Sequence, residues 1–359
     1  MFKNIKIERF RGIKYADIKD FKQVNLFFGD NNCGKSTLLE ALFSLTGQSN
    51  PLIPTQLNNI RGYRKVGRED MDINFYKFDS SKPIILSSIG KEDRELEITT
   101  FESSSKTIDI NNINTISSTS GENFHGFKLK YKLNGKSFNS EIVISDNLTK
   151  QDNPKIAVDS RYKETLYAEY LPANYNFASS LQGLSNIINN KEEHVIVSAL
   201  RMFDNRIKDF QINVDDIRVD IGWDKRVPIN IMGDGTRKLL VIIAAIYSCA
   251  NGIVFIDEID NGFHYSRLSP LWLMIDALAK RVNCQVFATT HNIDSIKSFA
   301  SIRSFAQQHK TDNHLNIDDI ISNSFAAFNL IHTKEDELKA LPYTLEQLNY
   351  VINQGVEVR

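Results

Sequence analysis

A glycine-rich loop that ends in lysine, serine and threonine is the first feature of the sequence that could carry chemistry. It runs from Gly29 to Thr37 and reads Gly-Asp-Asn-Asn-Cys-Gly-Lys-Ser-Thr. Glycines let the backbone curl so that several N–H groups point at one anion, the lysine reaches the β- and γ-phosphates of a nucleotide, and the serine hydroxyl can ligate Mg²⁺. The loop therefore predicts a nucleoside-triphosphate site. Its candidate ligands are Gly29, Asn31, Asn32, Gly34, Lys35, Ser36 and Thr37, and Ser36 is also a candidate metal ligand.

The residues around this loop favour a nucleotide site over an ordinary surface loop. An apolar run from Val24 to Phe28 stops at Gly29, and a helical pattern of leucines begins after Thr37. Strand, glycine loop and helix is the order that a phosphate-binding loop requires, because the helix presents the positive end of its dipole to the same phosphates.

Two acids follow a second apolar run, Ile253 to Ile256. A nearly continuous hydrophobic run is typical of a parallel strand that is buried on both faces, and ligands of such sheets lie at the carboxyl ends of the strands. Asp257 is placed to hold the Mg²⁺ shell, and Glu258 is placed to polarise the water that attacks the γ-phosphate. Many strands end in acids, so this interpretation depends on the phosphate loop about 220 residues upstream.

A third apolar run, Gln285 to Thr289, leads to His291. A histidine at such a strand end can hydrogen-bond the γ-phosphate and so respond to its presence. In isolation a structural histidine would be the simpler interpretation. The functional one is favoured because this strand follows the acidic strand by one predicted helix, which carries leucines at helical spacing from Leu268 to Leu278.

A pair of glycines precedes the apolar helix predicted from Leu239 to Tyr247. Gly233, Asp234, Gly235 and Thr236 stand at the start of this helix, where backbone N–H groups again favour an anion. The alternative is a plain glycine turn with a threonine cap. The order of the motifs along the chain favours the functional interpretation of Gly233, Gly235 and Thr236.

The remaining pattern predicts how these motifs are positioned. A β-hairpin or meander with a turn at Arg11-Gly12 is expected within residues 2–28, and a helix is expected from about Ser36 to Leu45. Further strands are predicted at 84–89, 95–101, 106–110, 126–133 and 138–144, within 154–171, and as a pair within 212–231, with two helices within 179–210. Asn134-Gly135 is a strong hairpin signal. The predicted domains are 1–50 and 212–359 as the two parts of a nucleotide-binding domain, 51–172 as an inserted β-rich lobe, and 173–211 as a helical lobe.

Composition indicates an ordinary globular protein. The chain has 359 residues and a net charge of −1, so no global basic field points to nucleic acid or to an anionic membrane. Its three cysteines lie far apart, the start of the chain lacks a signal-peptide pattern, and the uncharged stretch Leu239 to Ile256 reads as a buried helix, a turn and a strand. We therefore expect a cytoplasmic protein with reduced thiols and without a membrane partner.

The sequence leaves the role of one basic cluster open. Arg61, Arg64, Lys65 and Arg68 lie in an irregular segment. They could contact nucleic acid, a partner protein or nucleotide phosphates, or they could form a solvated surface.

Taken in order, these motifs resemble one family over nearly the whole chain. The chain resembles the ABC-type ATPases of the SMC, RecF and OLD class, and in particular the AAA-family ATPases of bacterial anti-phage defence systems. The matching motifs are Ile7–Ile13, the Walker A loop Gly29–Ser36, Gly233–Thr236, the Walker B strand Ile253–Glu258, Asp260–His264 and the switch Thr290-His291. The resemblance implies an α/β fold of the ABC-type P-loop NTPases, a mixed sheet with an inserted antiparallel β lobe and a helical lobe.

The resemblance also implies an assembly and residue roles. Two protomers would sandwich two ATP molecules with Mg²⁺, as a homodimer or a higher oligomer. Residues that act within one protomer would be Lys35, Ser36, Asp257, Glu258 and His291, with Lys35, Glu258 and His291 catalytic and Ser36 and Asp257 on the metal. Gly233 to Thr236 would face the nucleotide of the other protomer, and Asp260 to Gly262 would cross the dimer interface.

Two departures from the family pattern matter. The usual signature has a serine followed by two glycines, whereas this chain has Gly233-Asp234-Gly235. An aspartate near a γ-phosphate is repulsive unless it points away or faces a cation, so the contact would have to be rebuilt around Gly235 and Thr236, or hydrolysis would be slow. The glutamine that normally follows the first helix is not assignable, and Gln48 and Asp72 are both candidates.

The resemblance implies a function in defence. We expect an ATPase that serves as the sensor or scaffold of an anti-phage abortive-infection complex and acts with a separate effector such as a nuclease, because no nuclease motif follows residue 300 and no TOPRIM-like extension is present. The alternative is a RecF-like repair ATPase that binds DNA in an ATP-dependent way, which the near-zero net charge disfavours. The β-rich insertion disfavours a transporter subunit.

Overall fold

The computed structural model forms two compact units. It describes residues 1–63, 68–103, 123–145, 154–174, 184, 187–189, 191–213, 216–308 and 324–354. Unit 1 consists of Met1–Phe21, Asn32–Leu166 and Leu330–Ala340, and unit 2 consists of Lys22–Asn31, Tyr167–Asn329 and Leu341–Arg359. The chain therefore passes from unit 2 to unit 1 inside the predicted phosphate loop.

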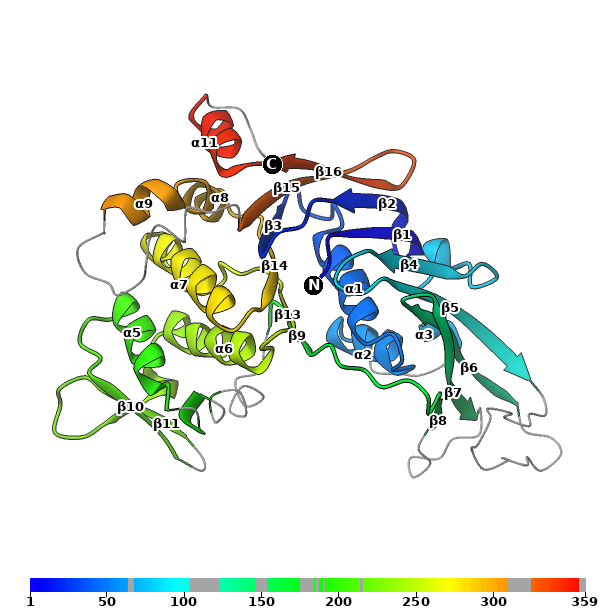
Figure 1. Cartoon of the computed structure of the whole chain (residues 1–359), viewed down its shortest axis with the longest axis horizontal. Coiled ribbons are helices and arrows are strands. Elements are labelled where there is room, and N and C mark those ends of the chain that lie inside the picture. Colours follow the sequence, from blue (N-terminus) through cyan, green and yellow to red (C-terminus); the bar gives the residue numbers. More distant parts are fainter. Residues whose placement is uncertain are drawn as a thin grey trace. The chain divides into compact units, whose positions relative to one another are not determined.

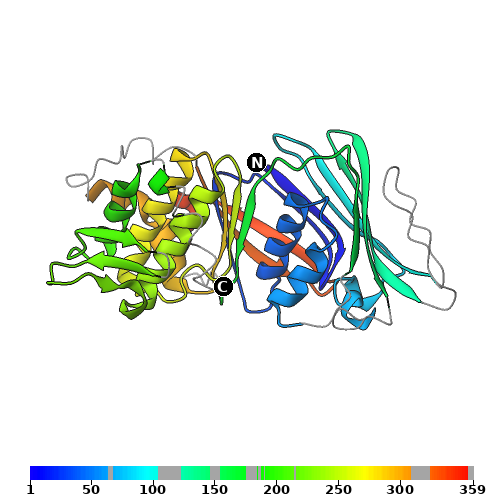
Figure 2. The same ribbon diagram turned by 90° about the horizontal axis from the view of Figure 1, so that it is seen from below.

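Unit 1 is built on a mostly antiparallel sheet. Its strands are β1 (Asn4–Phe10), β2 (Ile13–Lys19), β4 (Ile84–Ser88), β5 (Arg94–Ser103), β6 (Phe124–Leu133), β7 (Lys136–Ser145), β8 (Lys155–Val158) and the first part of β16 (Glu337–Tyr343). They lie in the order β8-β7-β6-β5-β4-β1-β2-β16, and only β2 and β16 pair in parallel. Helix α1 (Lys35–Thr46) packs against β1, β4 and β5. Figure 2 shows α1 beside the strands of this sheet. The unit also contains helices α2 (Ile53–Ile60) and α3 (Arg68–Asp72) and the 3-10 turn Tyr76–Phe78.

The hairpins of unit 1 follow from their turn residues. Asn134 and Gly135 have φ values of 48° and 80°, and Leu133 pairs with Lys136. Positive φ at both central residues is the requirement of a type I′ turn, which asparagine and glycine meet at little cost. The predicted Asn134-Gly135 hairpin is thus confirmed, as is the turn at Arg11-Gly12, where Phe10 pairs with Ile13. The predicted strand 106–110 lies outside the described residues.

Unit 2 is built on a parallel sheet. Its strands are β3 (Val24–Phe28), β9 (Ala168–Leu171), β13 (Ile253–Ile256), β14 (Gln285–Thr289) and the first part of β15 (Phe325–His332). They lie in the order β15-β3-β14-β13-β9 (Figure 1), and every pair is parallel. All residues of β3, β13 and β14 are buried, as expected for strands covered on both faces. The rings of Phe27, Phe287 and Phe255 stack in turn across these three strands.

Helices pack around this sheet and complete the core. They are α5 (Glu193–Phe203), α6 (Asp234–Ser248), α7 (Leu268–Arg281), α8 (Ile293–Ala300), α9 (Ile302–Gln308) and α11 (Leu345–Asn353), with 3-10 turns at Ile229–Ile231 and Tyr265–Arg267. Residues 239–247 of α6 are all buried, and β13 follows after a turn. This confirms the predicted helix and the interpretation of the uncharged stretch. None of the helices in the described part of the chain combines the length and apolar composition of a membrane span.

Two sequence predictions were wrong in detail. The segment 154–171 contains two strands, β8 in unit 1 and β9 in unit 2, rather than one. The chain turns after β8 because the carboxylate of Asp159 accepts the N–H of Arg161 at 3.0 Å. The predicted pair within 212–231 is a three-stranded sheet of β10 (Asp209–Ile212), β11 (Ile217–Asp220) and β12 (Val227–Pro228).

The other predicted segments are covered to different extents. Of the two helices predicted within 179–210, α5 is described, and most residues of the first lie outside the described part. The domain boundaries predicted from the sequence stay a proposal.

An ion pair between a buried arginine and a partly exposed glutamate links several segments of unit 1 to the end of α1. Arg94 is 1% exposed, and its two terminal nitrogens lie 2.9 and 2.8 Å from the carboxylate oxygens of Glu164. Arg94 also donates to the carbonyl oxygens of Leu45 and Thr46 at the end of α1, and Tyr162 donates to Glu164 at 2.6 Å. Burial raises the pKa of Glu164, but the hydrogen bonds and charge of Arg94 more than offset this, so the pKa of Glu164 lies below its usual value.

Glu164→Gln should destabilise the protein in a pH-dependent way. Removing the hydrogen-bond partner of a buried group costs about 1–3 kcal/mol, so the free energy of unfolding at neutral pH should fall by about that amount. A carboxylate with a lowered pKa contributes its stability above its usual pKa of about 4.3 and loses it as the pH falls through the folded-state pKa. The difference between variant and wild type should therefore shrink in acid.

Urea unfolding at neutral pH and at about pH 3 measures both effects. Glu92→Gln is the matched control, because Glu92 also pairs with Arg94, at 3.0 Å, but is more exposed than Glu164. If the difference in unfolding free energy between Glu164→Gln and wild type were the same at both pH values, the lowered pKa of Glu164 would be contradicted.

Candidate nucleotide-binding and catalytic site

The predicted phosphate loop has the backbone of an anion-binding turn. Gly29, Asn32 and Gly34 have φ values of 142°, 64° and 101°, and helix α1 begins directly afterwards at Lys35. Glycine adopts positive φ freely, and asparagine tolerates the left-handed region better than most residues. Gly34 is the N-cap of α1 and provides no side-chain cap, so the first N–H groups of this 12-residue helix are suited to an anionic ligand.

The helix after the loop is anchored by one carboxylate and two arginines. Glu40 is buried on α1, and its two oxygens lie 2.7 Å from the Nε atoms of Arg11 and Arg61. Arg61 also donates to the hydroxyl of Thr37 in the loop, at 3.2 Å. The role of Arg61 was left open by the sequence, and the structure places it beside the phosphate-loop helix. Arg64 and Lys65 of the same basic cluster, and the side chain of Arg68, lie outside the described part.

In unit 2, three strand ends bring the predicted chemistry to one edge of the sheet. The parallel register pairs Ile256 with Ala288, and Thr289 with Phe27. The residues that follow β13, β14 and β3 therefore emerge side by side. These are Asp257 and Glu258, Thr290 and His291, and Gly29, the first residue of the phosphate loop.

Thr289 links the two acids of this edge. Its hydroxyl donates to Oδ1 of Asp257 at 2.5 Å and accepts the backbone N–H of Glu258 at 2.9 Å. Glu258 has a φ of 48°, in the left-handed region that a glutamate rarely adopts. Thr289 was not singled out from the sequence, since a threonine at the end of a buried strand is common.

The Glu258 carboxylate lies between an amide and a histidine. Oε2 accepts a hydrogen bond from the Asn261 side chain at 2.5 Å, and Oε1 lies 3.7 Å from Nδ1 of His291. Both Glu258 and His291 are partly exposed, so a ligand at this edge can reach them. Asp260 next to them accepts a hydrogen bond from the hydroxyl of Thr290. The structure thus brings the predicted base and the predicted switch histidine together.

A buried lysine that the sequence did not reveal also meets this turn. Lys238 on α6 is 3% exposed, and its Nζ donates to the backbone carbonyl of Glu258 at 2.7 Å. Burial lowers the pKa of Lys238 to about 8, and the charges of Asp260, Glu258 and Asp257 limit the decrease. The one sequence signal was a lysine that directly precedes the uninterrupted apolar run of this helix.

The glycines at the start of α6 have different surroundings. A Cβ at Gly233 would meet no described atom within 4 Å, whereas a Cβ at Gly235 would lie 2.9 Å from the carbonyl oxygen of Gly262. Gly235 is therefore required for packing within unit 2, and Gly233 is open. Asp234 is 72% exposed and forms an ion pair with Arg237, one turn further on. Its carboxylate thus faces a cation and stands in the first helical turn, where a negative charge is favourable.

Gln48 is a candidate for the glutamine that follows the first helix in the family, but its side chain makes its hydrogen bonds away from the phosphate loop. It is fully buried after the end of α1, and its amide lies 3.3 Å from the hydroxyl of Tyr162 and 3.4 Å from the carbonyl of Lys132. At 1.5 Å per residue, α1 separates Gln48 from Lys35 by about 18 Å. Gln48 cannot contact the phosphates that Lys35 would bind.

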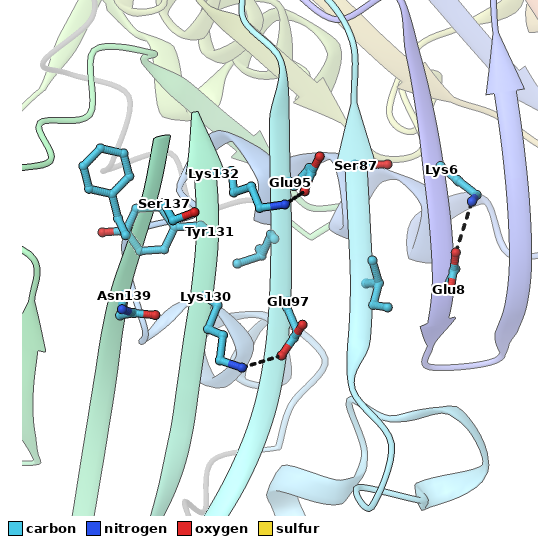
Figure 3. Close-up of a pocket in the computed structure, with 13 residues that line it drawn as sticks. Lys6, Glu8, Ser87, Glu95, Glu97, Lys130, Tyr131, Lys132, Ser137 and Asn139 are labelled. Carbon is cyan, nitrogen blue, oxygen red and sulfur yellow. Dashed lines mark hydrogen bonds and ion pairs between the residues drawn. The ribbon is translucent and has the colours of Figure 1, made fainter. Parts of the chain in front are cut away.

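A separate hollow lies on the sheet of unit 1 (Figure 3). It has a volume of about 300 Å³ over β1 and β4–β7. Its charged side chains are paired within or across strands, with Lys132 2.7 Å from Glu95, Lys130 3.2 Å from Glu97, and Lys6 3.2 Å from Glu8. Equal numbers of lysines and glutamates line it, so it carries no net charge that would select a ligand.

Comparison with known proteins identifies the family. Residues 24–296, more than half of the chain, match the family model described as "AAA domain, putative AbiEii toxin, Type IV TA system". The chain belongs to this AAA-domain family.

One relative of this AAA-domain protein is named for an enzyme activity. An ATP/GTP phosphatase of Helicobacter pylori is 30% identical over 342 residues, which cover 86% of this chain and 91% of the relative. The family and this relative confirm the enzyme class expected from the sequence, an ATPase.

Solved structures confirm the fold class. The AAA-domain protein is similar to an Smc head bound to the C-winged helix domain of ScpA, with a TM-score of 0.50 and 11% identity over 96% of this chain and 98% of the other. It is also similar to the Smc head domain with an extended coiled coil from Pyrococcus furiosus, with a TM-score of 0.51 and 9% identity over 99% of both chains. At such identities the likeness establishes the fold alone, a mixed α/β P-loop fold of the ABC type.

Thr289→Val should impair turnover more than folding. Valine keeps the shape of threonine, but it removes the hydroxyl that bonds Asp257 and the Glu258 N–H. A displacement of catalytic groups by about 1 Å can cost 100-fold in rate, so the kcat for ATP should fall by at least about 10-fold. The lost hydrogen bonds should cost about 1–3 kcal/mol of stability.

Thr289→Ser is the matched control because it retains the hydroxyl, and it should turn over close to the wild-type rate. Steady-state phosphate release and thermal unfolding measure the two effects. Normal turnover by Thr289→Val would show that the hydroxyl does not position the acids.

Proposed function

We propose that the protein hydrolyses ATP to ADP and phosphate at the edge where Gly29, Glu258 and His291 emerge from three neighbouring strands. The observation that carries this proposal is the Glu258 carboxylate, which lies beside His291 on the edge where the phosphate loop begins. A partly exposed carboxylate there is suited to polarise a water for attack on a γ-phosphate.

The other residues have complementary roles in this proposal. Lys35 and the N–H groups of residues 29–37 hold the β- and γ-phosphates, and His291 contacts the γ-phosphate. Ser36 and Asp257 supply the hydroxyl and carboxylate oxygens that suit Mg²⁺. Asp257 fits such a ligand, since its carboxylate directly follows β13 and is held by the hydroxyl of Thr289. Mg²⁺, when bound, neutralises charge on the β- and γ-phosphates.

A second protomer would complete the site. Gly233 at the open start of α6 can approach a ligand of another molecule without steric hindrance. The N-terminus of α6 and the hydroxyl of Thr236 are suited to a phosphate, and the pairing of Asp234 with Arg237 reduces its repulsion. We infer an ATP-sandwich homodimer, alone or within a higher oligomer, in which Gly233, Gly235 and Thr236 act on the partner's nucleotide.

The biological setting of this proposal is anti-phage defence. We infer that the ATPase is the sensor or scaffold of an abortive-infection complex in the cytoplasm, with a separate effector such as a nuclease. The family description, which names a toxin of a toxin–antitoxin system, supports this setting. The name of the Helicobacter relative supports hydrolysis of a nucleoside triphosphate and makes GTP the second substrate to assay.

Two variants separate nucleotide binding from hydrolysis. Lys35→Ala should abolish binding of ATP, because it removes the cation that reaches the phosphates. Glu258→Gln should retain binding, lower kcat by at least about 100-fold, and accumulate an ATP-bound dimer. Binding of a fluorescent ATP analogue, phosphate release and light scattering after gel filtration report the three quantities.

Normal turnover by Glu258→Gln would exclude Glu258 as the base, and tight ATP binding by Lys35→Ala would exclude the phosphate loop. Co-purification with the product of a neighbouring gene tests the effector. ATP-dependent binding to duplex DNA that weakens steeply with salt would favour the repair alternative instead.

A further inference from the structure

The unexplained feature of this site is the buried lysine on α6. Removing an ammonium group from water is costly unless it is paired. Lys238 is nearly inaccessible, and its Nζ lies 2.7 Å from the carbonyl oxygen of Glu258. The carboxylates of Asp257, Glu258 and Asp260 also attract it. A charged side chain has therefore been buried against the turn that carries the predicted base.

Hydrogen bonds from Lys238 and to Thr289 hold the backbone of Glu258, the predicted base. The Glu258 carbonyl accepts from Lys238, and the Glu258 N–H donates to Thr289. Both peptide groups of this residue are thus fixed while its φ stays in the left-handed region. The direction of a side chain follows from the placement of its backbone, so the position of the Glu258 carboxylate depends on the Lys238 hydrogen bond.

Other contacts join the first turns of α6 to the same turn. The Nζ of Lys238 lies 5.9 Å from the ring centre of Phe263. Gly235 approaches Gly262 so closely that a Cβ would lie 2.9 Å from the Gly262 carbonyl oxygen. The start of α6 and residues 258–263 are thus packed as one piece. A movement of the helix start would be passed on to Glu258.

We propose that Lys238 is a positioning residue that fixes the Glu258 carboxylate for hydrolysis and makes its position depend on the placement of α6. This inference rests on the proposed function, in which Glu258 activates water and the start of α6 meets the nucleotide of a second protomer. In this proposal the buried Lys238 acts through the backbone of Glu258 and not on the nucleotide itself. It links engagement of the partner's nucleotide by residues 233–236 to the orientation of the base in its own protomer.

Lys238→Met tests this role, because methionine keeps most of the length of lysine but cannot donate. The kcat for ATP should fall by about 10- to 100-fold, the range expected for a base displaced by about 1 Å. The affinity for ATP should stay at the wild-type value, and an ATP-bound dimer should accumulate as in Glu258→Gln. Lys297→Met is the matched control. It makes the same change at an exposed lysine of α8 in the same unit, and it should leave kcat unchanged.

Combining the two substitutions separates positioning from other effects. If Lys238 acts through Glu258, then Lys238→Met should not lower the residual rate of Glu258→Gln any further. A further loss by the same factor would overturn the proposal, as would wild-type kcat in Lys238→Met alone. Lys238→Arg, which keeps a charged donor, should recover part of the rate.

Folding and the proposed function are controlled separately. If Lys238→Met does not fold, as judged by thermal unfolding, Lys238→Gln is measured in its place and should show the same loss of kcat at unchanged ATP affinity. Wild-type kcat in Lys238→Gln would overturn the proposal equally. A wild-type chain without ATPase activity, or an active Glu258→Gln variant, would refute the proposed function itself. The inference fails alone if those two proteins behave as proposed and the Lys238 variants turn over normally.

Discussion

The parallel register of β3, β14 and β13 is the constraint on which the site depends. These strands are fully buried, so each can lie in the sheet only with its apolar residues covered on both faces. Pairing Phe27 with Thr289, and Ala288 with Ile256, leaves no freedom in where the following residues emerge. Chain segments more than 200 residues apart are thus brought to one edge by apolar packing, and the polar chemistry depends on that packing.

Contiguous patterns were predictable from the sequence because their physical cause is local. The glycine loop, the two buried strands that end in acids and in histidine, and the Asn134-Gly135 turn each depend on neighbouring residues. The hydrogen bonds that organise the acids were not predictable. Thr289 meets Asp257, and Lys238 meets the Glu258 carbonyl, across 32 and 20 residues. Such contacts follow from register and helix placement, which a pattern of residue types does not contain.

The errors and open points have the same origin. Periodicity does not show where an apolar stretch is divided, so one strand was predicted where a turn at Asp159 separates β8 from β9. Gln48 has the residue type of a nucleotide ligand, but it is buried against Tyr162. Gly233 and Gly235 look equivalent in the sequence, yet one is open and the other packs against Gly262. Residue type indicates what a side chain could do, and packing decides whether it can do it.

The carboxylate of Glu40 has a consequence for how this sequence can diverge. Arg11 in the first hairpin and Arg61 after α2 share it, although the three residues come from separate segments. Loss of Glu40 alone would remove a carboxylate that lies 2.7 Å from the buried guanidinium of Arg11, which is unfavourable. The three positions should therefore change together during evolution or not at all. Covariation among relatives at these three positions would identify the helix after the phosphate loop even in relatives whose loop sequence differs.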